Sequence, residues 1–298
     1  MQRPVGVIDL ALIAALALMW GSAFLLIKLA LPVFLPIDIV FWRLLVASLA
    51  LAILCVFSGQ PLPRRPSQWL MIAALGAIAN GLPFFLVSWS ETRMDSGFSA
   101  MMIASVPLWT AALIPLFVPE EHLTRRRVTG IVIGFLGVAL LTGGLSASSW
   151  HADLLAKACL LIAAFSYAAG VIIIRRLWAV PALATAMGMN VTAWLSVVPA
   201  ALLLGEPLKF PTDWPATLAV GGLGLFSSAA ASLVLVLLIG RIGAARASVT
   251  NYLVPLVAAL LGALVLDERM GPENLAGLAL ILVGVGISTR QPRAGTTP

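Results

Sequence analysis

The chain has 298 residues, of which 61% are hydrophobic and 10% charged, and its mean hydropathy is +1.07. A soluble domain carries about 25% charged residues, so this composition excludes a cytosolic enzyme, a disordered regulator and a nucleic-acid-binding protein. The formal net charge of +6 is spread over short loops rather than gathered into the patch that nucleic-acid binding requires.

Apolar runs follow one another along the whole chain, with short connections between them. A bilayer core about 30 Å thick takes roughly 20 helical residues to cross, and backbone polar groups in lipid must be satisfied internally. We therefore expect an all-α membrane protein with ten transmembrane helices. In chain order they are expected at Val7–Leu31, Ile37–Phe57, Gln68–Ser90, Ser96–Val118, Arg127–Leu145, Ala152–Ile174, Pro181–Leu204, Pro215–Ile239, Ala244–Leu266 and Pro272–Ser288.

The distribution of Lys and Arg predicts the orientation. With the N-terminus in the cytoplasm, twelve of the 18 basic residues fall on the cytoplasmic side and four on the other side. Cytoplasmic segments of membrane proteins are enriched in Lys and Arg. We expect a multi-pass protein of the cell inner (plasma) membrane with both termini in the cytoplasm.

The sequence matches itself when it is shifted by 147 residues. The matched pairs include Trp20 with Tyr167, Lys28 with Arg175, Asn80 with Ser227, Glu121 with Glu268, Gly130 with Gly277 and Gly137 with Gly284. We expect two repeats of five helices, over residues 1–147 and 148–298. Because five is odd, the second repeat must be inverted, which is a transporter design with the site at the repeat interface. The alternative is a duplication that only enlarges the bundle.

Several short motifs follow one another along the chain, and those of the fourth and fifth expected spans are repeated in part in the second half. They are Met19-Trp20-Gly21-Ser22-Ala23-Phe24, Phe41-Trp42-Arg43, Ser96-Gly97-Phe98-Ser99-Ala100, Pro107-Leu108 and Glu121-His122-Leu123-Thr124, with Pro255-Leu256 and Asp267-Glu268-Arg269 in the second half. In these motifs the chain resembles the drug/metabolite transporter superfamily, specifically its EamA-type branch of bacterial amino-acid and metabolite exporters. The resemblance implies ten helices, alternating access and export of amino acids or other small metabolites.

Aromatic and polar side chains near the middle of the expected spans are candidates for a substrate cavity, because pockets combine apolar walls with a few polar groups. The candidate substrate-binding residues are Trp20, Ser22, Asn80, Phe84, Ser99, Trp109, Tyr167, Ser227 and Asn251. For Trp20 and Tyr167 the alternative is ordinary bundle packing, and for Asn80 it is an interhelical hydrogen bond. Ser99, Ser227 and Ser228 are more often packing residues that let helices approach closely.

Three further residues are expected to act in gating or structure: Arg43, Pro107 and Pro255. Arg43 and Lys157 are basic residues inside expected spans, and an intramembrane charge is a functional candidate. For Arg43 a structural or gating contact and anion binding are equally favoured, whereas Lys157 lies near a span end and is expected to reach the outer interface. Pro107 and Pro255 match across the repeats, which favours paired helix bends.

The sequence offers little for catalysis or metal binding. Both histidines, His122 and His151, lie in expected loops, and the chain has no Gly-x-Ser-x-Gly motif. All twelve acidic residues lie at span ends or in loops, so no proton relay of buried acids is expected. We therefore expect neither an enzyme nor a bound cofactor or metal, and no selectivity filter indicates a channel.

The sequence thus predicts a secondary transporter. The resemblance implies that its substrates are amino acids or related small metabolites. A carrier of sugar phosphates or nucleotide sugars in the same superfamily is the alternative. That alternative would need several cations at the cavity. The expected partners are a small-molecule substrate and the lipid bilayer, with the chain acting as a monomer or homodimer.

Overall fold

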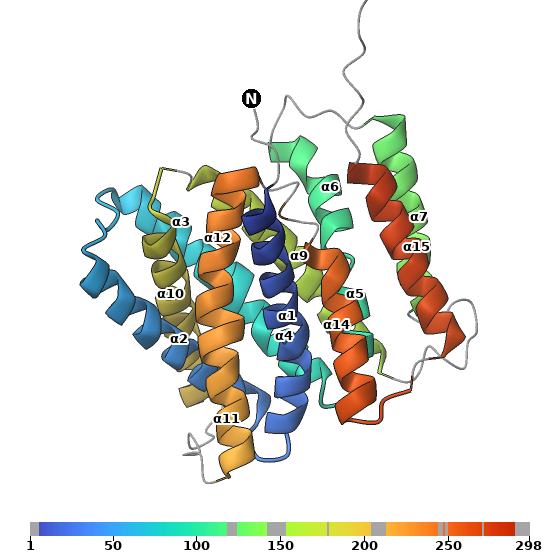
Figure 1. The fold of residues 1–298 in the computed structure, drawn as a ribbon, viewed down its shortest axis with the longest axis horizontal. Helices are drawn as coiled ribbons and strands as arrows, with labels where there is room; N and C mark the ends of the chain where they lie inside the picture. Colours follow the sequence, from blue (N-terminus) through green and yellow to red (C-terminus); the bar gives the residue numbers. More distant parts are fainter. Residues whose placement is uncertain are drawn as a thin grey trace, which may run out of the picture.

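The computed structural model is a helical bundle (Figure 1). It describes residues 6–117, 124–141, 153–177, 179–203, 213–243, 247, 250–269 and 271–289, and within these ranges it contains no β-strand. The α-helices are α1 (Val7–Ala30), α2 (Pro36–Ser58), α3 (Pro66–Gly76), α4 (Leu82–Ser90), α5 (Ser96–Ile103), α6 (Val106–Phe117), α7 (Arg125–Leu141), α9 (Leu154–Arg176), α10 (Ala182–Leu203), α11 (Trp214–Gly222), α12 (Ala231–Ile242), α14 (Thr250–Val265) and α15 (Pro272–Thr289). Two π-helical segments, η1 (Ala77–Gly81) and η2 (Leu223–Ala230), join α3 to α4 and α11 to α12.

Within the described residues, seven helical segments are long and apolar enough to cross a membrane. They are Val7–Ala30, Pro36–Ser58, Pro66–Ser90, Ser96–Leu113, Leu154–Ile174, Ala182–Leu203 and Trp214–Ile242. Three shorter apolar helices cover Val128–Leu140, Leu253–Val265 and Pro272–Ile287. The chain is therefore a multi-pass helical membrane protein, as the composition predicts.

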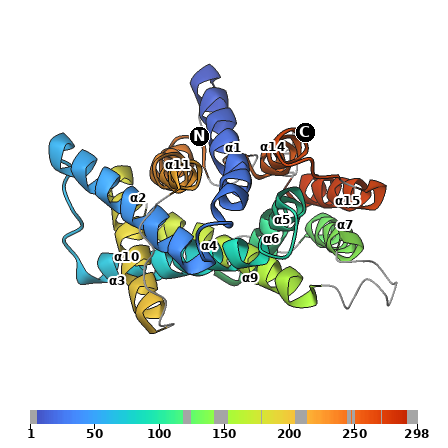
Figure 2. The same cartoon turned by 90° about the horizontal axis from the view of Figure 1, so that it is seen from below.

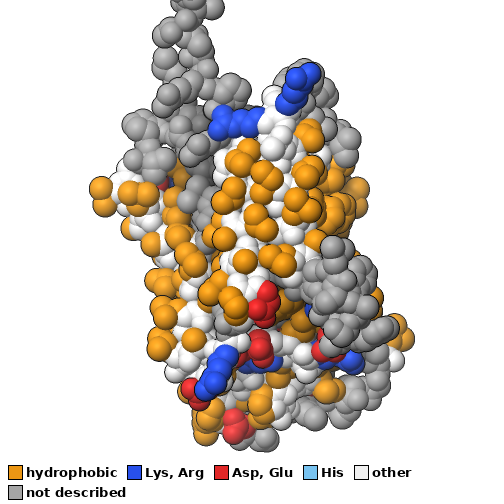
Figure 3. Space-filling model, turned by 90° about the vertical axis from the view of Figure 1, so that its right-hand side faces the viewer, with side chains coloured by type: hydrophobic (Ala, Val, Ile, Leu, Met, Phe, Trp, Pro, Cys, Tyr) orange, Lys and Arg blue, Asp and Glu red, His pale blue; other side chains and the backbone are white. Residues whose placement is uncertain are grey.

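The outer surface of the bundle is apolar. Phe57 and Leu203 are 85% and 86% exposed, which would be unfavourable in water but suits a lipid-facing surface. Figure 3 shows hydrophobic side chains over the middle of one face, with basic side chains at its upper end and both charge types toward the lower end. This banding matches a hydrocarbon layer between two polar interfaces.

Prolines set the start of several helices. Pro36, Pro66 and Pro215 lie in the first turn of α2, α3 and α11, where a missing N–H costs no helical hydrogen bond. Asp213 also caps α11, because its Oδ1 accepts a 2.9 Å hydrogen bond from the Ala216 nitrogen.

The expected span Ser96–Val118 is interrupted in the structure. The helix stops at Ile103 and resumes at Val106, with turns at Ala104 and Ser105. The cause is Pro107, whose ring clashes with the carbonyl four residues earlier, at Ile103. Residues of the span beyond Phe117 lie outside the described residues.

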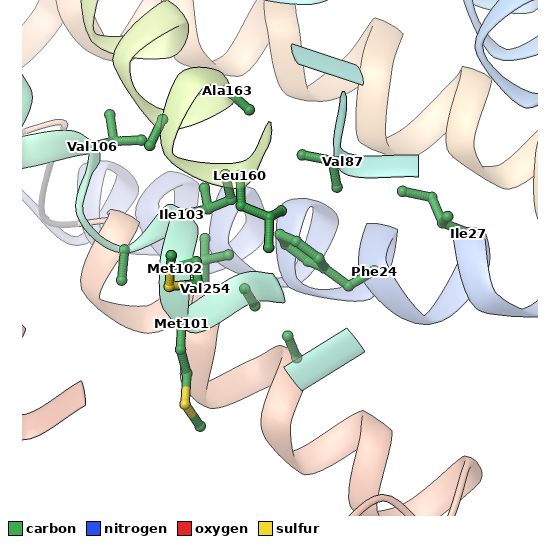
Figure 4. Close-up of a cluster of buried hydrophobic side chains, with 14 of the residues drawn as sticks. Phe24, Ile27, Val87, Met101, Met102, Ile103, Val106, Leu160, Ala163 and Val254 are labelled. Atoms are coloured by element: carbon green, nitrogen blue, oxygen red, sulfur yellow. The ribbon is translucent and has the colours of Figure 1, made fainter. Parts of the chain in front are cut away.

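Helices from the first half of the sequence pack against helices from the second half. α7 lies beside α15 and α2 beside α10, while α1 packs on α12 and α14 and α9 packs on α4 and α6 (Figures 1 and 2). Side chains from helices of both halves, among them α1, α4, α5, α9 and α14, contribute to the largest buried apolar cluster. In Figure 4, Phe24 of α1 points toward Ile103 of α5 and Leu160 of α9. The two halves of the sequence therefore share one core.

Glycines bring α7 and α15 into close contact. A Cβ built on Gly284 would lie 2.3 Å from the Gly134 nitrogen, and one on Gly137 would lie 2.6 Å from the Gly277 carbonyl oxygen. Lipid is as apolar as a leucine side chain, so helices in membranes associate through such close backbone packing. These glycines thus serve contacts within the chain.

Gly284→Val is expected to destabilise the protein by about 1–3 kcal/mol, because the added methyl groups overlap backbone atoms of α7 that cannot move aside. Thermal unfolding of the purified protein in detergent measures the effect. Gly286→Val is the matched control, since a Cβ at Gly286 meets nothing within 4 Å on the same helix. Equal unfolding temperatures for the two variants would contradict the assigned contact.

Candidate functional site

Arg43 lies at a junction of four helical segments. Its Nε donates a 3.1 Å hydrogen bond to the Ser228 Oγ of η2, and its guanidinium carbon lies 3.8 Å from the centroid of the Phe84 ring on α4. The side chain is only 3% exposed, so it does not extend to an interface. The Phe84 ring in turn lies 6.4 Å, centroid to centroid, from the Tyr167 ring on α9. The structure therefore brings together Arg43, Phe84 and Tyr167.

A second set of hydrogen-bonded polar side chains lies around Asn80 on η1. The Asn80 Nδ2 donates to the Asn190 Oδ1 of α10 over 3.4 Å. The Asn190 Nδ2 donates to the Ala186 carbonyl at 2.8 Å and to the Ser232 Oγ at 3.1 Å. Asn80 therefore makes the interhelical hydrogen bond that the sequence left as an alternative to substrate contact.

The two π segments occupy matching places in the two halves. η1 contains Asn80 and η2 contains its counterpart Ser227. The Ser227 Oγ donates a 2.7 Å hydrogen bond to the Met19 carbonyl of α1, and the Ser166 Oγ of α9 donates to the Ile78 carbonyl of η1. π segments inside α-helices occur frequently at functional sites.

The remaining candidates are more dispersed. Trp20 is partly buried where two apolar clusters meet, and Ser22 donates to the Met19 carbonyl of its own helix at 3.2 Å. Trp109 packs edge-on against the Phe135 and Phe165 rings, with centroids 4.8 and 5.5 Å away. The rest are placed as follows: Ser99 is fully buried on α5, Asn251 is partly buried on α14, Pro107 lies in the first turn of α6, and Pro255 lies inside the continuous helix α14.

A carboxylate joins the two halves where α5 begins. The Glu268 Oε1 accepts a 2.8 Å hydrogen bond from the Ser96 nitrogen. Its Oε2 accepts one of 2.8 Å from the Ser96 Oγ and one of 3.0 Å from the Gly97 nitrogen. An anion at a helix N-terminus also interacts favourably with the helix dipole. We call this contact the Glu268 latch.

Glu91 lies at the same end of the bundle, directly after α4. It is 1% exposed, and neither carboxyl oxygen has a hydrogen-bond partner within the described residues. Burial is the largest influence and raises the pKa of Glu91 well above its usual range. Lys28 and Arg43 oppose the rise, and Glu268 adds to it. Its place after a span gave no sign of this burial in the sequence.

At the opposite end of the bundle an ion pair links α1 to α12. The Arg241 Nε lies 2.8 Å from the Asp9 Oδ1, and the Asp9 carboxylate is fully buried. The Asp9 Oδ2 also accepts a 3.0 Å hydrogen bond from the Gly6 nitrogen. Lys157, in the first turn of α9, is 7% exposed. In the part of the chain that the structure describes, no group of three or more His, Cys, Asp or Glu residues could hold a metal ion.

Comparisons with known proteins indicate that the chain is a transporter. The EamA-like transporter family matches residues 8–143 and 154–290, so the chain has the architecture of a polytopic membrane transporter. The chain belongs to the EamA-like transporter family, which is a family of transporters and not of enzymes.

Relatives support the same class. The chain is 30% identical to the "Uncharacterized inner membrane transporter YedA" of Escherichia coli, over 91% of this chain and 85% of that protein. It is 28% identical to the "Probable terminal-alkyne amino-acid exporter" of Streptantibioticus cattleyicolor, over 94% of each chain. It is 27% identical to the "Probable amino-acid metabolite efflux pump" of Salmonella typhimurium, over 90% of each. A solved crystal structure superposes with a TM-score of 0.69 at 17% identity, covering 94% of this chain and 96% of that one, which shows a shared fold.

Proposed function

We propose that this chain is a secondary transporter of the inner (plasma) membrane that exports amino acids or similar small metabolites by alternating access. The proposal includes ten transmembrane helices in two inverted repeats, over residues 1–147 and 148–298, with both termini in the cytoplasm. Two relatives support the substrate class, because one is named a probable terminal-alkyne amino-acid exporter and the other a probable amino-acid metabolite efflux pump. The packing of α7 on α15 and of α2 on α10 supports the repeats, because each pair joins equivalent helices.

The observation that carries the proposal is the meeting of Arg43, Phe84, Tyr167 and Ser228 between elements of both halves. A site between repeats can open to one side or the other as the repeats rock against each other. We assign the substrate-binding role to this junction together with Trp20, Ser22, Asn80, Ser99, Trp109, Ser227 and Asn251. Pro107 and Pro255 would then shape the helices that open.

Counterflow in proteoliposomes tests this function. Vesicles loaded with neutral, basic or acidic amino acids, sugars or phosphorylated metabolites are diluted into labelled substrate, and uptake against protein-free vesicles is measured. Accumulation with amino acids inside is expected. A response to phosphorylated compounds alone would support the sugar-phosphate or nucleotide-sugar alternative, and no response to any class would overturn the proposed transport.

A further inference from the structure

The guanidinium of Arg43 is a buried charge whose bonding is incomplete. It carries five N–H donors, and in the described part of the chain its hydrogen bonding consists of the Nε contact with Ser228. Within the described residues its Nη atoms make no hydrogen bond, so these donors are left for a ligand. The Phe84 ring stabilises the cation from one face but supplies no counter-charge.

Nearby groups do not neutralise this charge. Ser228 and Tyr167 are neutral, and Arg43 forms no ion pair within the described residues. Glu91 is the acid that acts on it electrostatically. However, Glu91 makes no hydrogen bond or ion pair with Arg43 within the described residues, and burial raises its pKa. A cation in this setting is strongly stabilised by an anion that arrives with the substrate.

We propose that Arg43 binds a carboxylate of the transported substrate through its Nη atoms, which makes small monocarboxylates, amino acids among them, the substrate class. This inference rests on the proposed function. The planar fork of a guanidinium matches a carboxylate in a two-bond geometry. The Ser228 contact fixes Nε on one side, and the Phe84 ring fixes the plane, so the Nη edge is held in place for the ligand.

The charge of the site favours a carboxylate over a phosphate ester. A phosphate group carries about 1.5 to 2 negative charges at pH 7 and is usually met by several cations. The described contacts at this junction supply one guanidinium, which balances one carboxylate.

The first test uses the unmodified protein in proteoliposomes. The competitors are L-leucine, L-threonine and L-phenylalanine and the primary amide of each. The measurement is how strongly each compound reduces the counterflow of a labelled amino acid. Each amino acid is expected to compete about 10- to 100-fold more strongly than its amide, as the loss of a charged hydrogen-bonding pair implies. Equal competition by acid and amide would overturn the role of the carboxylate while leaving the proposed transport intact. Absence of amino-acid counterflow would instead contradict the proposed function.

Variants then assign the effect to Arg43. Arg43→Gln should remove the preference for acid over amide, and Arg43→Lys should restore part of it because the charge returns without the fork. Arg93→Gln is the matched control: Arg93 also lies over an aromatic ring, 4.6 Å from the Trp89 centroid, but its side chain is 50% exposed. A preference that persists in a folded Arg43→Gln protein would refute the assignment. If Arg43→Gln does not fold, the comparison of acid with amide in the unmodified protein and in Arg43→Lys still tests whether Arg43 binds the carboxylate.

Discussion

Replacing Glu268 with alanine is expected to lower the free energy of unfolding by about 1.5–3 kcal/mol, the range for losing hydrogen bonds to a charged group. The Glu268 latch supplies the acceptors for two backbone N–H groups and one hydroxyl at the start of α5. Without the carboxylate, the first turn of α5 loses both its cap and its favourable charge.

Thermal unfolding in detergent measures the loss. The unfolding temperature of Glu268→Gln should lie between those of the parent and Glu268→Ala, because its single amide oxygen can still accept a hydrogen bond but carries no charge. Glu273→Ala is the control, since Glu273 is an exposed acid nearby in sequence, in the first turn of α15. If Glu268→Ala unfolds at the same temperature as Glu273→Ala, the latch does not hold α5.

The same latch should also affect transport. It joins α5 of the first half to the segment after α14 of the second half, so opening this end of the proposed transporter requires it to separate. Counterflow by Glu268→Ala is therefore expected to differ in rate from the parent at equal amounts of folded protein. An unchanged rate would place the latch outside the transport cycle.

Helix positions followed from the sequence because their causes are local. The length of each apolar run and prolines such as Pro36 and Pro66 are visible without any tertiary information, and α2 and α3 begin where those prolines place them. The interruption before Pro107 has an equally local cause, although its consequence, two helices in place of one, was not predicted. The wide turns of η1 and η2 have no comparable signal, because a π segment depends on the packing around it.

The candidate site was only partly predictable, because the contacts between its residues depend on tertiary packing. Composition and depth identified Arg43, Phe84 and Tyr167 separately, and the structure brings them together. The partner of Asn80 is Asn190, a residue that is not among the candidates predicted from the sequence. The burial of Glu91 was missed because a residue one position beyond a span can lie in water or under a neighbouring helix, and sequence position does not distinguish the two.

Glu91 should make the stability of the protein fall as the pH rises. Its pKa in the folded protein lies well above the ordinary value of 4.5, chiefly because of burial, so above that value the folded chain holds a proton that the unfolded chain has released. The slope of stability with pH follows the difference in bound protons, unfolded minus folded, which here is negative. Each pH unit between the two pKa values therefore costs up to about 1.4 kcal/mol.

Glu91→Gln removes this titration while keeping the shape of the protonated side chain. The variant is expected to gain stability relative to the parent as the pH is raised above the ordinary pKa of 4.5, with the gap widening by up to about 1.4 kcal/mol per pH unit. Glu273→Gln, at an exposed position, should run parallel to the parent over the same range. Unfolding temperatures measured in detergent at several pH values give the comparison. A gap between Glu91→Gln and the parent that stays constant with pH would contradict the raised pKa of Glu91.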